Sequence, residues 1–196
     1  MGSAPVRLLA LDLDDTLLRS DLTISFHTRN VLKRAEKAGI TVVLASGRFP
    51  PAMERFSVQL GLNKRHGYLI CDNGAIIQET LSGKAVFEAR LPPGAALIAY
   101  DLADAEGFPV QIYEGDLMYI SRENEFTAYT RKLTGIKQAV LTDFRARIKE
   151  GCYRLLIPGD PMILRPLEGL FRSYIGDEVT LFTSKPYFLE ILPPGI

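Results

Sequence analysis

Short apolar runs alternate with amphipathic stretches over the first 75 residues. The runs Val6–Leu11, Ile40–Ala45 and Tyr68–Cys71 are typical of strands that are buried on both faces of a parallel sheet. Between them apolar positions recur at helical spacing, and we predict that Ser25 caps one helix and Gly61 ends another. The order β-α-β-α-β with short connections predicts three parallel strands of a doubly wound α/β sheet.

From residue 75 onward the pattern changes to antiparallel pairs mixed with helices. Two hairpins are predicted, with turns at Ser82-Gly83 and Glu114-Gly115-Asp116. Helices are expected at Pro93–Glu106, Glu123–Thr134 and Met162–Tyr174. Strands are expected at Cys152–Ile157, Val179–Thr183 and Tyr187–Leu192. This mixture indicates an α+β domain, so we predict two domains, residues 1–82 and 83–196.

Composition narrows the class of protein. Lys and Arg number 23 against 23 Asp and Glu, and 47% of residues are hydrophobic, which argues against disorder and against a nucleic-acid partner. Cys71 and Cys152 lie in apolar runs, as expected for buried free thiols in a reducing compartment. Met1–Pro5 does not resemble a signal peptide, and no apolar run reaches the length of a membrane span. We therefore expect a cytoplasmic protein with no membrane partner.

Three acidic residues follow the first predicted strand directly. Ligands of open parallel sheets bind beyond the carboxyl ends of the strands, and Asp12, Asp14 and Asp15 lie at such an end. Alternation along the chain directs Asp12 and Asp14 to the same side, where two converging carboxylates favour an intervening Mg²⁺. One carboxylate could attack an electrophile while its neighbour carries protons.

Four segments carry a resemblance to a known family. Leu11–Leu18 (LDLDDTLL) resembles the first signature of the haloacid dehalogenase superfamily, and Ala45–Arg48 (ASGR) resembles its second. Cys71–Ala75 (CDNGA) and Pro186–Ile191 (PYFLEI) are similar to segments of its Cof-type sugar-phosphate phosphatases. The resemblance implies a Rossmann-like core, present here in part with three parallel strands, and an inserted α+β cap domain of the C2 type.

The resemblance also implies a mechanism. Asp12 would be the nucleophile that forms an aspartyl-phosphate, and Asp14 would be the general acid and base. Mg²⁺ would be held by the Asp12 carboxylate and the Asp14 backbone carbonyl. The substrate would be a small phosphorylated metabolite, a sugar phosphate or similar monoester, and its predicted contacts are Ser46, Gly47, Arg48 and Asn73. For Arg48 the alternative to a substrate contact is a surface ion pair, and for Asn73 it is a purely structural role in its turn. The Thr16 hydroxyl is expected to form a hydrogen bond with the backbone of the acidic loop.

Two catalytic features of the family would follow the cap. They are a lysine and an acidic pair, and this sequence ends at Ile196 before either, with Lys185 as the nearest substitute for the lysine. We therefore expect this 196-residue form to be impaired, and to be a fragment, to self-associate, or to pair with a complementing C-terminal chain through its first strand.

Two other functions are considered. One is a non-catalytic protein that binds phosphosugars or another partner with the same pocket. The other is a phosphoacceptor signalling domain, in which Asp14 and Asp15 hold Mg²⁺ and Asp72 accepts the phosphoryl group. The second leaves the Ser-Gly-Arg segment and the α+β domain unexplained.

Overall fold

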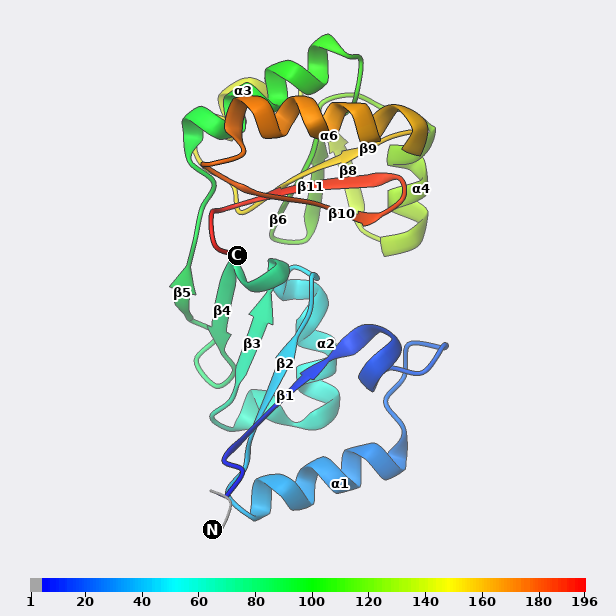
Figure 1. Cartoon of the computed structure of the whole chain (residues 1–196). Helices are drawn as coiled ribbons and strands as arrows, with labels where there is room; N and C mark the ends of the chain where they lie inside the picture. The colour runs from blue at the N-terminus through cyan, green and yellow to red at the C-terminus, as the bar shows by residue number, and fades with distance from the viewer. Residues whose placement is uncertain (1–4) are drawn as a thin grey trace. The chain divides into compact units, whose positions relative to one another are not determined.

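The chain forms two compact units, each with its own sheet (Figure 1). The computed structural model describes residues 5–196, apart from the side chains of residues 133 and 134. The prediction that residues 1–5 are not a signal peptide therefore rests mostly on residues outside the described part. One unit ends at Glu88 and the other spans Ala89–Ile196. The predicted boundary lay at residue 82, and the first unit continues to Glu88 because β5 (Ala85–Glu88) pairs with β4 (Ile76–Glu79).

The first unit contains a five-stranded sheet in the order β1-β2-β3-β4-β5. Its first three strands, β1 (Leu8–Asp12), β2 (Thr41–Ala45) and β3 (Tyr68–Cys71), are parallel, as predicted, whereas β4 and β5 are antiparallel. Helices α1 (Phe26–Lys37) and α2 (Pro50–Leu60) connect the parallel strands. The carboxyl ends of these strands consequently lie at one edge of the sheet.

Local signals at the helix ends behave as predicted. The Ser25 hydroxyl accepts a hydrogen bond from the Thr28 amide at 3.0 Å and caps α1. Gly61 ends α2 with a φ of 74°, a left-handed conformation that glycine adopts without strain. The short 3-10 turn η2 (Leu62–Lys64) follows.

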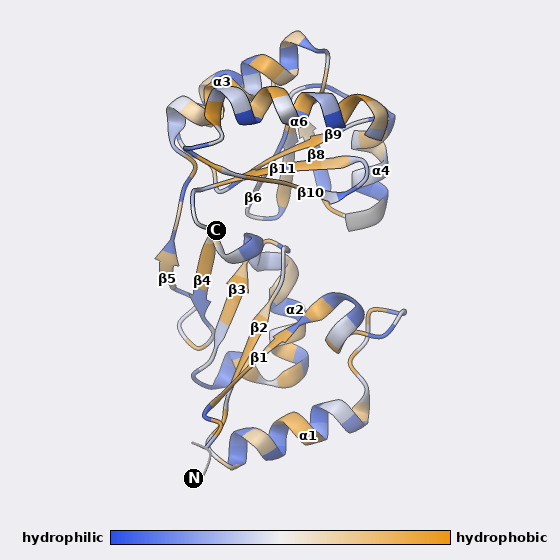
Figure 2. Cartoon of the chain, in the orientation of Figure 1, coloured by the Kyte–Doolittle hydropathy of each residue, from blue (hydrophilic) through white to orange (hydrophobic). Residues whose placement is uncertain are grey.

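Strand β1 is more exposed than its sequence indicates. The apolar run predicted burial on both faces, but Val6 is 66% and Leu8 is 54% exposed. Strand β1 lies at the end of the sheet and pairs with β2, which takes the interior position and buries Val42, Val43 and Leu44. Hydropathy alone, shown in Figure 2, does not distinguish these two strands, because burial depends on the neighbours that a strand receives.

The second unit contains a six-stranded sheet in the order β10-β11-β9-β6-β7-β8. Its strands are β6 (Gln111–Glu114), β7 (Leu117–Ile120), β8 (Lys137–Val140), β9 (Leu155–Pro158), β10 (Thr180–Lys185) and β11 (Phe188–Leu192). Its helices are α3 (Pro93–Ala105), α4 (Glu125–Thr134), α5 (Phe144–Lys149) and α6 (Pro161–Ile175). The core cluster joins one face of the sheet to α3, α5 and α6, with Phe144 and Phe171 at most 2% exposed.

Most predicted elements of the second unit are present, and two were missed. The hairpin β6–β7 has the predicted turn, and its register pairs Gln111 with Ile120. Strand β8 (KQAV) and helix α5 (FRARIK) were not predicted, because their polar and basic residues leave too few large apolar positions to show a period. In the first unit the sequence likewise did not indicate the π-helical turn η1 (Leu13–Leu17).

Candidate active site

The acidic loop after β1 is held by its leucines. Turn η1 buries Leu13 completely and leaves Leu17 8% exposed, so the apolar positions face the interior. The acidic residues between them remain exposed. Asp15 has a φ of 56°, which turns the chain sharply after Asp14. The loop thus presents Asp12 and Asp14 to solvent at the carboxyl end of the sheet.

The Asp12 carboxylate has a local partner. The Thr16 hydroxyl donates to Asp12 Oδ2 at 3.0 Å, across a single turn of the loop. The expectation that Thr16 bonds backbone is therefore wrong, because the tight turn brings its hydroxyl over the carboxylate. This hydrogen bond orients one oxygen of Asp12.

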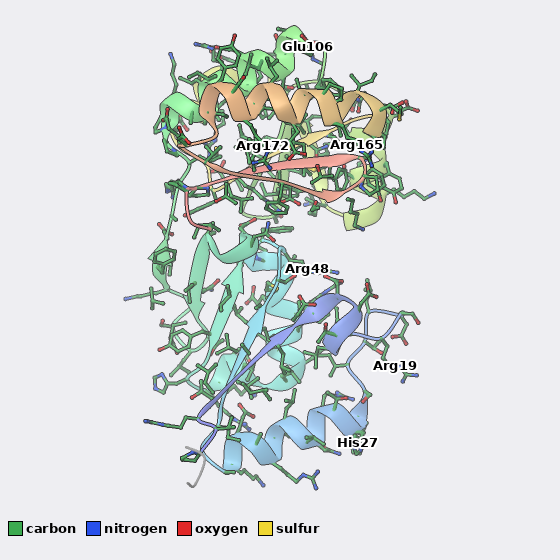
Figure 3. The ribbon with its side chains drawn as sticks, in the orientation of Figure 1. Arg19, His27, Arg48, Glu106, Arg165 and Arg172 are labelled. Atoms are coloured by element: carbon green, nitrogen blue, oxygen red, sulfur yellow. The ribbon has the colours of Figure 1, made fainter. Side chains whose placement is uncertain are left out.

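The Asp14 carboxylate forms an ion pair with Arg48. Arg48 Nε donates to Asp14 Oδ2 at 3.0 Å, and Arg48 Nη2 donates to Oδ1 at 2.7 Å. The two residues come from adjacent strand ends and are 34 positions apart in the sequence. The alternative of an ion pair for Arg48 thus describes this structure, and its partner is Asp14, the carboxylate predicted to be the general acid and base (Figure 3, where Arg48 is labelled).

The turn that follows β2 is tied to β3. The Ser46 amide donates to the Ile70 carbonyl at 2.9 Å and continues the strand pairing. The Arg48 amide donates to Ser46 Oγ at 3.2 Å, which closes a short turn directly before α2. A turn leading into a helix N-terminus is favourable for an anion.

The residues after β3 pack against this turn. The Asp72 amide donates to the Arg48 carbonyl at 2.9 Å, and the Asn73 amide donates to the Ser46 carbonyl at 3.4 Å. A Cβ atom at Gly47 would lie 2.5 Å from Asn73 Oδ1, so a larger residue at this position would displace the Asn73 side chain. Asp72 and Asn73 have φ values of 48° and 58°, held by these contacts in the 3-10 turn η3 (Asp72–Gly74). The structure therefore brings Ser46, Gly47, Arg48 and Asn73 together.

Asp72 does not suit the phosphoacceptor role. Asp72 is only 3% exposed, whereas a phosphoacceptor must be reached by a phosphoryl donor. Burial, with the neighbouring charge of Asp72, also raises the pKa of the Cys71 thiol to about 12. The buried Asp72 is a structural tie between the strand ends, a role that the sequence alone did not indicate.

The oxygen donors of the loop suit a hard cation only in part. Mg²⁺ binds through one or two carboxylates and keeps several waters, and the Asp12 carboxylate with the Asp14 backbone carbonyl matches this chemistry. Within residues 5–196 no group of three His, Cys, Asp or Glu side chains could hold a metal ion. Lys185 ends β10 in the other unit and is exposed.

Similar proteins include a solved hydrolase structure and proteins named as phosphatases. A haloacid dehalogenase-like hydrolase from Bacteroides thetaiotaomicron is 29% identical with a TM-score of 0.89, over 98% of this chain and 73% of that one. The phosphatase candidate YxeH from Bacillus subtilis is 29% identical, over 95% of this chain and 70% of its own. An HMP-PP phosphatase from Escherichia coli is 27% identical, over 96% of this chain and 68% of its own.

None of the helices within residues 5–196 has the length and apolar character of a membrane span.

Membership of the family follows from the sequence match. Residues 9–196, which include all four predicted signature segments, match the haloacid dehalogenase-like hydrolase family. The resemblance inferred from those segments is thereby confirmed: the chain belongs to the haloacid dehalogenase-like hydrolases.

Proposed function

We propose that the chain is a Mg²⁺-dependent phosphatase that acts on small phosphorylated metabolites, sugar phosphates or similar monoesters, through an aspartyl-phosphate intermediate. The observation that carries this proposal is the exposed Asp12 carboxylate, which accepts a hydrogen bond from Thr16 and lies opposite Ala45, directly before the turn at residues 46–48. Relatives named as phosphatases support the reaction class.

In the first step an Asp12 carboxylate oxygen attacks phosphorus, and the bond from phosphorus to the ester oxygen breaks. Asp14, which takes up a proton from solvent when its ion pair with Arg48 opens, donates that proton to the ester oxygen, so the leaving group departs as a neutral alcohol. The Ser46 hydroxyl and the Gly47 amide bind phosphoryl oxygens at the start of α2. The Thr16 hydroxyl keeps Asp12 in place during the attack.

In the second step water hydrolyses the aspartyl-phosphate. Asp14, now a carboxylate, removes a proton from water, the water oxygen bonds to phosphorus, and the bond from phosphorus to Asp12 breaks. Inorganic phosphate leaves, and both aspartates return to their starting states. The Asp12 carboxylate and the Asp14 carbonyl would hold Mg²⁺, which neutralises phosphoryl charge when bound.

A second candidate function is phosphosugar binding without turnover. It is favoured by the Asp14–Arg48 ion pair, which occupies the proposed acid and base. The small number of metal-binding side chains favours it as well, because we expect Mg²⁺ to bind weakly to residues 5–196.

Release of inorganic phosphate from a panel of sugar phosphates, with Mg²⁺ and with chelator, tests the primary proposal. Asp12→Asn should abolish both turnover and phosphoenzyme formation, because an amide is a poor nucleophile. The matched control is Asp15→Asn in the same loop, where asparagine also tolerates the φ of 56° and activity should persist.

The outcomes separate the candidates. Mg²⁺-dependent release that Asp12→Asn removes supports the phosphatase. Affinity for a sugar phosphate that is the same with and without Mg²⁺, together with no release, supports the binding protein. Turnover that persists in Asp12→Asn would show that the nucleophile is another residue.

A further inference from the structure

Arg48 engages the Asp14 carboxylate with both arms of its guanidinium fork. The distances are 3.0 Å from Nε to Oδ2 and 2.7 Å from Nη2 to Oδ1, so both carboxylate oxygens accept a hydrogen bond. The Arg48 side chain is 26% exposed and that of Asp14 is 49% exposed. The pair is accessible to a ligand from solvent.

The backbone of Arg48 is fixed, whereas its side chain reaches out from the turn. Its amide donates to Ser46 Oγ, and its carbonyl accepts from the Asp72 amide. Its guanidinium carbon lies 5.6 Å from the centroid of the buried Phe56 ring. Two hydrogen bonds therefore fix the Arg48 backbone directly after the Ser46–Gly47 turn, within reach of an anion bound there.

The guanidinium fork fits a carboxylate and a phosphate equally well, but it cannot hold both with the same arms. Asp14 must have an oxygen available to the ester oxygen or to water, and in this structure both oxygens are engaged. Exposed ion pairs are weak enough for a dianionic phosphoryl group to displace one partner.

We propose that Arg48 is a phosphate-responsive latch: it holds Asp14 while the site is free, and the phosphoryl group of a substrate takes the guanidinium and releases Asp14. This inference rests on the proposed function for the role of Asp14. Its consequence is that the carboxylate becomes available when a phosphoryl group is bound. Arg48 is then a sensor of the phosphoryl group as well as a ligand for it.

The latch predicts competition between Asp14 and phosphate for Arg48. The test is a double-mutant cycle on the dissociation constant of inorganic phosphate, measured by NMR titration of the full chain in chelator. Asp14→Ala should tighten phosphate binding about fivefold when Arg48 is present, the upper range for an exposed ion pair. In the Arg48→Ala background the same change should tighten binding much less, because only general charge repulsion remains.

Arg55 provides the matched control. Its guanidinium carbon lies 4.4 Å from the centroid of the same Phe56 ring, and Arg55 lies on α2, whereas Arg48 precedes that helix. In the Arg55→Ala background, Asp14→Ala should tighten phosphate binding by the same factor as in the wild type. The NMR signal of the Arg48 Nε–H group should also shift on phosphate addition.

Each outcome decides the inference. Equal factors with and without Arg48, an Arg48 Nε–H signal unmoved by saturating phosphate, or no phosphate binding to the wild type or any variant would overturn it. The phosphatase proposal fails by a different measurement, the absence of Mg²⁺-dependent phosphate release from monoesters, because binding in chelator requires no turnover.

Discussion

Gly47 offers a sharp test of how the site is packed. A Cβ atom added there would lie 2.5 Å from Asn73 Oδ1 and 3.4 Å from Asn73 Cγ. Ordinary contact distances are about 3.5 Å or more, so the Asn73 side chain must rotate or shift in Gly47→Ala. The Asn73 side chain is exposed and can rotate, but its backbone N–H is hydrogen-bonded to the Ser46 carbonyl and holds the residue in place. We therefore expect the strained rotamer to cost about 1–1.5 kcal/mol.

A second effect has the opposite sign. Gly47 does not have the positive φ that alanine avoids, and at such positions glycine to alanine stabilises by about 0.5 kcal/mol through the unfolded chain. Gly47→Ala should therefore destabilise by a net of about 0.5–1 kcal/mol. In an Asn73→Gly background the obstacle is gone, and glycine tolerates the φ of 58°. There the same substitution should stabilise by about 0.5 kcal/mol.

The assay is amide hydrogen exchange in β2 and β3, which reports on the first sheet and not on the whole chain. Urea unfolding followed by circular dichroism gives a second measure of the free energy of unfolding. The expected coupling between the two sites is about 1–1.5 kcal/mol. The same change in both backgrounds would show that the Asn73 side chain does not occupy the space above Gly47, and the packing argument would then be wrong.

Burial raises the pKa of the Cys71 and Cys152 thiols to about 12, so a thiol reagent at pH 8 should label them quickly only in urea; rapid native labelling would contradict this. Hydrogen bonds from Ser82 lower the pKa of Glu79 from 4.5 to about 2, so its stabilisation is present above pH 4.5 and lost as the pH falls toward 2. Glu79→Gln should flatten that part of the stability profile, and an unchanged acid slope would refute the assignment. The open edge of β1 should support self-association or pairing with a complementing chain, and Leu8→Lys should shift light-scattering mass toward monomer; a wild-type monomer at high concentration would count against self-association.

Local features of the site could be predicted because a few neighbouring residues specify them. A strand that ends in acidic residues, a serine before a helix and a glycine after one each act within about four positions of the chain. The four signature segments likewise predicted the family, and the order of the apolar runs predicted the three parallel strands. These predictions need no knowledge of which segments meet in space.

Partnerships between distant segments could not be predicted in the same way. Arg48 reaches Asp14 across 34 positions only because β1 and β2 are neighbours in parallel, with Asp12 opposite Ala45. Asn73 lies over Gly47 because β3 pairs in parallel with the other edge of β2. The residue types indicated charge and hydrogen-bonding capacity, but the order of strands in the sheet determines which residues become partners.

The same distinction applies to β1. Its sequence determined an apolar strand that ends at Asp12, whereas only the tertiary structure decided that it is an edge strand with Leu8 exposed. Backbone propensity and hydropathy are properties of a segment, and burial is a property of the neighbours that cover it. The chain therefore encodes the Asp12 and Asp14 carboxylates locally, and their environment arises when the strand ends come together.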